Sequence, residues 1–253
     1  MEENTTQDKY VHGMDWGQGE VSLSDLNNYR KYQYDLVAKY VGKEILEVGS
    51  GSRGFTKQIL NENADLNKIV SIEPSVQLHK LYKDKYPFPD FVSSACKDIF
   101  ELDASDFGTF DTIFFIHVLE HIEKDKAALD HTHSLLSKDG YVLIEVPALQ
   151  WLFSGHDEML GHYRRYNKSM MKNIIDPNKY DIVKLWYQDP IGVLGSLFFF
   201  KLRKIKLKSD QGRDLVSKQG GIYDKYIIPF EKQIEKFITF PFGLSLTAVL
   251  KKK

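Results

Sequence analysis

The 253-residue sequence contains a single cysteine, Cys96, and its 34 basic and 35 acidic side chains almost cancel. One cysteine excludes an internal disulfide and any multi-cysteine zinc site. A net charge of −1 provides no field that would draw the chain onto nucleic acid. No run approaches the ~20 apolar residues that span a bilayer, and the polar start at Met1 resembles no signal segment. We therefore expect a reduced, cytoplasmic protein without a nucleic-acid partner.

Short apolar runs alternate with helical stretches through the first 147 residues, and we find no internal repeat. The expected strands are 44–48, 69–72, 91–95, 110–116 and 141–146, and the expected helices between them are 56–61, 75–85 and 120–136. Because these strands lack a polar face, the pattern predicts an α/β fold in which helices cover both faces of a parallel sheet.

The alternation of strands and helices is absent at both ends of the chain. Residues 1–42 combine a polar, glycine-containing arm with a helix that Ser24 would cap. After Pro147, strand-like runs return only at 180–187 and 244–250. About 55 residues separate them, and a connection of this length commonly forms a lid, an oligomer contact or a substrate wall. We expect residues 1–42 to act as a lid on a domain of residues 43–253, with residues 188–242 as an inserted element.

A glycine-rich turn lies between the first strand and its helix. Gly49, Gly51 and Gly54 fit the G-x-G-x-x-G pattern of dinucleotide sites, although a strand-to-helix turn needs glycine for conformation alone. Glu47, two residues earlier, would repel a pyrophosphate. S-adenosylmethionine carries no phosphate, and its sulfonium and ammonium groups are positive. The sign of the charge therefore favours S-adenosylmethionine over a nicotinamide dinucleotide.

Two more carboxylates follow later strands. Glu73 ends the second strand, within reach of a ribose diol in a doubly wound sheet. Both kinds of cofactor use such a residue, so Glu73 does not distinguish them. Asp98 follows the third strand and can accept a hydrogen bond from an adenine amino group while Ile99 packs on the ring. The alternative role for Asp98 is a helix N-cap.

The sequence resembles the class I S-adenosylmethionine-dependent methyltransferases in three segments, which follow one another in the family's order. These segments are Ile45 to Gly51, Ser71 to Pro74, and Phe110 through His117 to Ile122. The resemblance covers residues 43–147. It implies a doubly wound, seven-stranded, mostly parallel Rossmann-like sheet whose last strand is antiparallel, with 180–187 and 244–250 supplying the final pair. One departure is Arg53, which takes the place of the family's third glycine. The cofactor-binding residues that the resemblance implies are Glu47, Gly49, Ser50, Gly51, Glu73, Pro74, Asp98, Ile99 and His117.

His117 and His121 are spaced i, i+4, which on a helix can present two metal ligands. No third ligand lies nearby in the sequence, so we expect no metal site. In the resembling family this segment lines the cofactor pocket. We therefore expect His117 to contact cofactor or substrate and His121 to cap or pack.

The segment 154–166 is rich in histidine, arginine, tyrosine and acidic residues. It follows the fifth strand, at the sheet edge where open α/β sheets bind ligands. One interpretation makes His156 or His162 a general base that Asp157 orients. The candidate substrate-binding residues in the same segment are Tyr163, Arg164 and Tyr166, and Arg164 or Arg165 could pair with an anionic acceptor. The alternative interpretation is a polar latch that ties the loop to the sheet through salt bridges.

The function that these patterns favour is methyl transfer from S-adenosylmethionine to a small-molecule oxygen or nitrogen acceptor, such as a sugar, a lipid-linked molecule or a secondary metabolite. The alternatives are a nicotinamide-dependent oxidoreductase and a cofactor-binding module without turnover. An apolar-then-basic segment at 193–208 suits contact with a membrane surface or a lipid substrate. A buried helix with a basic last turn, or a homodimer contact, would explain the same segment.

Overall fold

The computed structural model describes residues 27–85, 88–198, 221, 223–235 and 237–253. The polar arm, the Ser24 cap and the basic run at 201–208 lie outside the described residues. The strands are β1 Glu44–Val48, β2 Lys68–Ile72, β3 Val92–Ala95, β4 Phe110–Ile116, β5 Leu136–Pro147, β6 Tyr180–Gln188 and β7 Ser245–Lys252. The helices are α1 Asn27–Val37, α2 Gly54–Glu62, α3 Val76–Lys85, α4 Ala104–Phe107, α5 Asp125–Leu135, α6 Gly155–Leu160, α7 Lys168–Ile174, α8 Pro190–Ser196 and α10 Ile228–Glu235.

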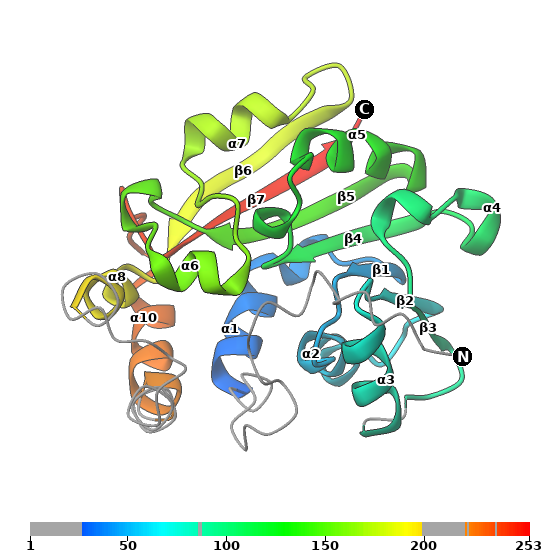
Figure 1. The fold of residues 1–253 in the computed structure, drawn as a ribbon, viewed down its shortest axis with the longest axis horizontal. Coiled ribbons are helices and arrows are strands. Elements are labelled where there is room, and N and C mark those ends of the chain that lie inside the picture. Colours follow the sequence, from blue (N-terminus) through cyan, green and yellow to red (C-terminus); the bar gives the residue numbers. More distant parts are fainter. Residues whose placement is uncertain (1–26, 86–87, 199–220, 222, 236) are drawn as a thin grey trace, which may run out of the picture.

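The seven strands form one sheet in the order β3-β2-β1-β4-β5-β7-β6 (Figure 1). The pairs from β3 to β5 are parallel, and β7 runs antiparallel to both β5 and β6. The order reverses beside β1, so the crevice between β1 and β4 is the switch point at which such sheets bind ligands. The predicted doubly wound Rossmann-like fold with an antiparallel last strand is confirmed.

Alternate residues of each central strand enter two separate cores. On β1, Leu46 and Val48 join the cluster that includes side chains of α5 and α7, whereas Ile45 joins the cluster that includes α1 and α2. Figure 1 shows these two pairs of helices on opposite sides of the sheet. The period-2 alternation of a strand thus supplies both cores. As a result, the strand ends are held rigidly between two helical layers.

The predicted helix at 120–136 was wrong at its start. Residues Leu119–His121 form a 3₁₀ turn, and α5 begins only at Asp125. The Arg164 guanidinium accounts for the break, because it donates hydrogen bonds to the carbonyls of Ile122 and Glu123. A continuous α-helix would use these carbonyls internally. The next strand also differs, since β5 begins at Leu136 rather than at the expected position 141.

Helix α1 and the inserted element meet in space. The amide of Tyr29 donates a 2.7 Å hydrogen bond to Asp224, and the Tyr32 hydroxyl donates one of 2.5 Å to Glu235. Lys232 forms an ion pair with Asp35. Within the inserted element, α10 ends at Glu235 and follows a π-helical turn at Tyr223–Ile227. No helix in the described ranges is both long and apolar enough to span a membrane.

Candidate functional site

The carboxyl ends of the parallel strands bring five ionisable side chains to one edge of the sheet. They come from β1, from the residues that follow β2, β3 and β4, and from β5: Glu47, Glu73, Asp98, His117 and Glu145. Four of these were predicted from the sequence. Glu145 was missed, although a carboxylate inside the apolar run of β5 is an unusual feature that signals a role.

The glycine turn folds back on β2. The amides of Gly49 and Ser50 both donate hydrogen bonds to the carbonyl of Ile72, at 2.8 and 2.9 Å. Gly49 has φ +70°, and a Cβ at this position would lie 2.6 Å from Val118. Gly51 has φ +47°, but a Cβ there would meet no atom within 4 Å. Gly49 is therefore required for packing, whereas Gly51 borders open space that a ligand can fill.

Arg53 explains the departure from the family's third glycine. It caps α2 in the left-handed conformation, with φ +61°, which is the conformation that glycine adopts most easily. Its guanidinium donates a 2.6 Å hydrogen bond to Ser94 on β3 and lies over the ring of Phe88. The arginine therefore preserves the turn while its side chain joins α2 to the neighbouring strand.

Glu47 is a buried carboxylate with one oxygen engaged. Its Oε2 accepts hydrogen bonds from the hydroxyls of Thr56 and Ser71, the latter at 3.0 Å. Within the described residues, Oε1 accepts none. Burial raises the pKa of Glu47 to about 7 despite these two hydrogen bonds. A positive ligand group beside Oε1 would stabilise the ionised form.

Glu73 is 5% exposed and is fixed by two backbone amides. Gly51 donates to Oε2 at 2.8 Å and Ser75 donates to Oε1 at 2.9 Å. A carboxylate oxygen can accept two hydrogen bonds, so a carboxylate fixed at this place suits the two hydroxyls of a ribose. Of these two donors, Gly51 belongs to the glycine turn and Ser75 lies between β2 and α3.

Asp98 has the capping role that was its alternative interpretation. Its Oδ1 accepts from the amide of Phe100, and Glu101 accepts from the amide of Asp98, so the two side chains form a capping box. The cap leaves Asp98 partly exposed at the same edge. Ile99 is only 2% exposed and belongs to the core, so little of its surface is available to an adenine ring.

Glu145 is the centre of a network that joins β4, β5 and α1. Its Oε1 contacts His117 at 3.1 Å and accepts hydrogen bonds from Gln33 at 2.8 Å and from the Tyr29 hydroxyl at 3.3 Å. Burial would lower the pKa of His117, but Glu120 and Glu145 outweigh burial and raise the pKa to about 9. His117, which is one-third exposed, is therefore a cation at neutral pH.

A buried latch is present within segment 154–166, but its salt bridges join residues of the loop to one another, and the loop meets β5 through the backbone hydrogen bond from Tyr166 to Pro147. Asp157 is fully buried, and its Oδ1 lies 2.7 Å from Arg165 Nε and 3.0 Å from His162 Nδ1. Its other oxygen accepts from the amide of Ser154 at 3.0 Å. Burial would raise the pKa of Asp157, but the contacts with His162 and Arg165 outweigh burial and hold the pKa at about 2. The same contacts orient His162.

The expected substrate-binding residues occupy different environments. Tyr166 is fully buried, and its hydroxyl donates hydrogen bonds to Asp125 and to the carbonyl of Leu119. Arg164 lies 2.7 Å from the same aspartate. Both residues therefore support the loop from within the protein. Tyr163 is 54% exposed and keeps a surface for a substrate.

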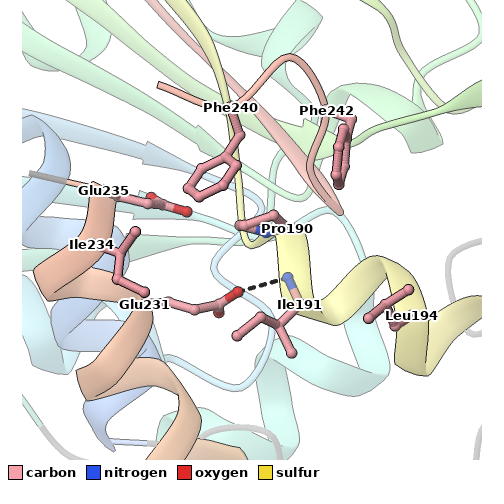
Figure 2. A pocket seen from close by; sticks show the side chains of 8 residues that line it. All are labelled: Pro190, Ile191, Leu194, Glu231, Ile234, Glu235, Phe240 and Phe242. Atoms are coloured by element: carbon pink, nitrogen blue, oxygen red, sulfur yellow. Dashed lines mark hydrogen bonds between the residues drawn. The ribbon is translucent and has the colours of Figure 1, made fainter. Parts of the chain in front are cut away.

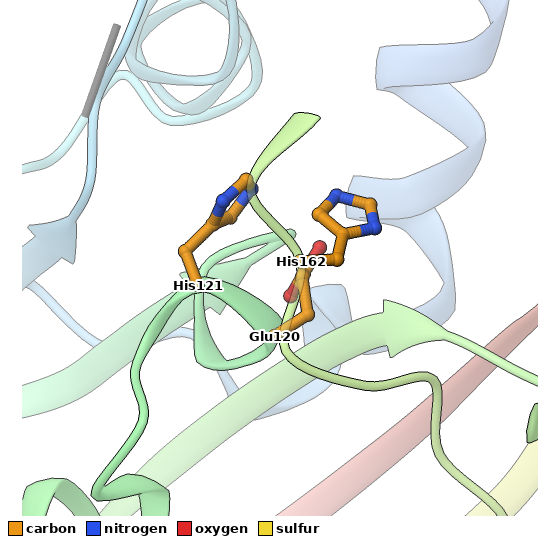
Figure 3. Close-up of side chains that lie close together, drawn as sticks. All are labelled: Glu120, His121 and His162. Atoms are coloured by element: carbon orange, nitrogen blue, oxygen red, sulfur yellow. The ribbon is translucent and has the colours of Figure 1, made fainter. Parts of the chain in front are cut away.

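The fold places His162 beside Glu120 and His121, although about 40 residues separate them in the sequence (Figure 3). The rings of His121 and His162 meet edge to face with centroids 4.7 Å apart. His121 lies in a 3₁₀ turn after His117, so the two are not a helical i, i+4 pair. His156 is mostly buried, and burial lowers its pKa to about 4.

A separate pocket of about 240 Å³ lies between α8 and α10. Figure 2 shows that Glu231 accepts a hydrogen bond from the Ile191 amide there, at 2.7 Å. Most of the lining is apolar: Pro190, Ile191, Leu194, Ile234, Phe240 and Phe242, with Glu231 and Glu235. The pocket belongs to the element predicted as an insertion.

The family profile described as "Methyltransferase domain" matches residues 27–200. The chain also resembles the solved structure of the plantazolicin methyltransferase BpumL in complex with S-adenosylhomocysteine, with 14% identity, coverage of 91% of this chain and 83% of that one, and a TM-score of 0.53. A SAM-dependent methyltransferase from Archaeoglobus fulgidus has 17% identity, coverage of 90% and 94%, and a TM-score of 0.56.

A third structural neighbour, the [4+2]-cyclase SpnF, has 15% identity, coverage of 88% and 80%, and a TM-score of 0.56. No curated protein matches the chain significantly. At these identities the structural neighbours show the fold alone, and the cyclase shows that one fold hosts different chemistry.

Proposed function

The chain belongs to the methyltransferase-domain family and is a class I enzyme that uses S-adenosylmethionine, and we propose that it methylates an oxygen or nitrogen atom of a small-molecule acceptor. The observation that carries the proposal is an unbroken set of contacts along the sheet edge. His162 lies beside Glu120, Glu120 lies 3.5 Å from His117, and His117 contacts Glu145. A candidate base is thereby linked to the strand ends that surround the glycine turn.

The residues around the turn fit the cofactor's charge. Glu47 and Glu73 are buried carboxylates, and the sulfonium and ammonium groups of S-adenosylmethionine are positive. A pyrophosphate would face both carboxylates in a poorly screened site, which disfavours a nicotinamide dinucleotide. Open space next to Gly51 supports contact between the ligand and the turn.

We assign the cofactor-binding residues by their places at the edge. The backbone of Gly49, Ser50 and Gly51 would line the cofactor, with Glu73 and Pro74 at its ribose. Asp98 and Ile99 would lie near the adenine, with Ile99 offering little surface, and His117 would lie towards the acceptor. When bound, S-adenosylmethionine supplies an activated methyl group with a neutral thioether as its leaving group.

The protein's part in the reaction is to hold the acceptor in line with the methyl group and to accept a proton where the acceptor needs to lose one. Asp157 Oδ1 contacts His162 Nδ1, which leaves Nε2 as the nitrogen that faces other groups. His156, whose pKa burial lowers to about 4, is a poor base at neutral pH. His162 is therefore our preferred residue for this role.

We propose that α1 and the inserted element 188–242 form a joint wall for the acceptor. The hydrogen bonds from Tyr29 and Tyr32 to the inserted element support a common unit. The apolar pocket between α8 and α10 and the exposed side chains of Leu194 and Phe237 support an acceptor with an apolar part, such as a lipid-linked molecule or a secondary metabolite. Peripheral membrane contact or a homodimer would use the same surface.

A comparison of ligands tests this proposal. S-adenosylhomocysteine should raise the melting temperature, whereas NADH should not. Release of S-adenosylhomocysteine should then identify an acceptor from panels of sugars, lipid-linked molecules and aromatic metabolites. Cofactor binding without turnover on any panel, but with methylation of a protein or nucleic acid, would contradict the small-molecule assignment.

A further inference from the structure

We propose that Glu120, His121 and His162 bind a divalent transition-metal ion of the zinc type. The three residues offer one carboxylate and two imidazoles, and the ligand atoms lie within 4.8 Å of one another (Figure 3). This inference departs from the sequence-based expectation of no metal, which considered only neighbours of His117 and His121. The third ligand arrives from the loop after α6.

Glu120 provides the first independent observation. Its carboxylate is fully buried, and neither oxygen accepts a hydrogen bond from the described residues. His117 Nδ1 lies 3.5 Å from Glu120 Oε1. Glu145 shares this His117 cation, so the two buried carboxylates leave one negative charge, which is costly to bury without a further cation. Figure 3 shows this carboxylate between the rings of His121 and His162.

His162 provides the second observation. Its Nδ1 lies 3.0 Å from Asp157 Oδ1, and Arg165 and Ser154 hold Asp157 in place. Histidines that bind metals commonly donate their other ring nitrogen to a carboxylate, which fixes the ring and its tautomer. The buried latch thus supplies the support that a metal-binding Nε2 requires.

The donor set favours one class of ion. Two imidazoles and one carboxylate suit zinc and similar transition metals, whereas Mg²⁺ and Ca²⁺ prefer oxygen ligands. Ligands around a tetrahedral zinc lie ~3.4 Å apart for bonds of about 2.1 Å. The observed limit of 4.8 Å therefore requires the ligand atoms to approach one another by as much as ~1.4 Å. Three protein ligands leave a coordination position for an exchangeable ligand.

A metal would also refine the role of His162, and this step rests on the proposed function. With Nε2 on the metal, His162 does not take the acceptor's proton itself. An acceptor hydroxyl group in the exchangeable position would instead release its proton to solvent water, because the metal would lower the pKa of that hydroxyl. The site would then favour acceptors with an oxygen close to the methylated atom.

Metal binding can be measured without an acceptor. Protein treated with EDTA and dialysed is titrated with Zn²⁺ by calorimetry, and with Co²⁺ by visible absorption. We expect one ion per wild-type chain, and at least tenfold weaker binding in both Glu120→Gln and His162→Gln. The matched control is His133→Asn, which removes a histidine that packs on Tyr180, and it should bind the ion as wild type does.

Stability supplies a second readout. Zn²⁺ should raise the melting temperature of wild type and His133→Asn but not of Glu120→Gln, which should be at least as stable as wild type without metal. Equal Zn²⁺ binding in wild type and Glu120→Gln, or none in wild type, would overturn the proposal and leave protonated histidines as the partners of Glu120. Binding of S-adenosylhomocysteine is measured on the same samples, so that loss of the cofactor site is distinguished from loss of the metal site.

Discussion

The backbone amide of Gly51 donates a 2.8 Å hydrogen bond to the carboxylate of Glu73. This contact joins the glycine turn after β1 to the residue that follows β2. The other carboxylate oxygen of Glu73 accepts from Ser75, so the side chain is fixed before any ligand arrives. Preorganisation of this kind lowers the entropic cost of binding.

Substitution of the two turn glycines should have separable effects. Gly49→Ala should lower the free energy of unfolding by about 2 kcal/mol, because the new methyl group meets Val118 and the backbone has positive φ. Gly51→Ala should cost about 1 kcal/mol from its positive φ alone. It should weaken cofactor binding more than stability, since its methyl group enters open space.

Urea denaturation and calorimetry measure these two effects. Gly155→Ala is the matched control, because a Cβ there meets nothing within 4 Å. Val118→Ala should partly restore the stability of Gly49→Ala. Equal stability of Gly49→Ala and Gly155→Ala would contradict the packing explanation.

Glu47 should make stability depend on pH. Burial raises its pKa to about 7, above the value of an unfolded glutamate, so the folded protein retains a proton that the unfolded chain releases. The stabilisation from this group is present at low pH and declines as pH rises from about 4.5 to about 7. Glu47→Gln should therefore gain stability relative to wild type at pH 8 but not at pH 4.5. It should also bind S-adenosylhomocysteine more weakly.

Denaturation at the two pH values checks this prediction. Glu62→Gln, at the end of α2, is the control for a general effect of charge removal. A stability difference between Glu47→Gln and wild type that is the same at both pH values would show that Glu47 is not the titrating group.

The buried latch around Asp157 should contribute more to the free energy of unfolding than a surface ion pair does. Asp157→Asn leaves the Arg165 cation buried without its counter-charge, so the free energy of unfolding should fall by about 3 kcal/mol at pH 7. Because the pKa of Asp157 is held at about 2, wild type should lose this contribution as pH falls from about 4 to about 2. Thermal denaturation across pH measures both effects.

Lys126→Ala is the comparison for the latch, since its exposed pair with Asp130 should contribute less than about 1 kcal/mol. If Asp157→Asn and Lys126→Ala were equally mild, the latch would contribute nothing beyond a surface pair.

The two candidate bases should behave differently once an acceptor is known. His162→Gln should lower kcat by roughly 10²-fold or more, because it removes either the base or a metal ligand. His156→Asn should keep kcat within about threefold, since a histidine with a pKa near 4 is a poor base at neutral pH. Full turnover with an unchanged pH profile in both variants would exclude a base in this segment.

The sequence predicted the sheet and the first half of the site because both depend on local patterns. Apolar runs predicted the positions of β1 to β5. Glu47 and Glu73 were predicted as site residues because they lie at strand ends in the sequence. The assignments of cofactor and acceptor contacts to individual residues stay predictions. Local sequence patterns were therefore sufficient to predict the ligand-binding edge of the sheet and the negative charge of its carboxylates.

The remainder depends on contacts between distant segments. The break before α5 arises because Arg164, 42 positions after Ile122, takes that residue's carbonyl. Glu145 gained its role only through partners on α1 and after β4. Tyr166 looked like a substrate contact beside Tyr163, yet the fold buries one and exposes the other. The periodicity of a single segment cannot predict such contacts between residues that are distant in the sequence.

The most direct test of the account is calorimetric titration of S-adenosylhomocysteine into wild type and Glu73→Gln, with Glu62→Gln as the control. We predict one binding site in wild type and in the control, no binding of NADH, and at least a tenfold weaker affinity in Glu73→Gln, because a buried hydrogen bond to a charged group is worth about 1.5–3 kcal/mol. Affinity that is unchanged in Glu73→Gln, or binding of NADH in place of S-adenosylhomocysteine, would contradict the cofactor site described above.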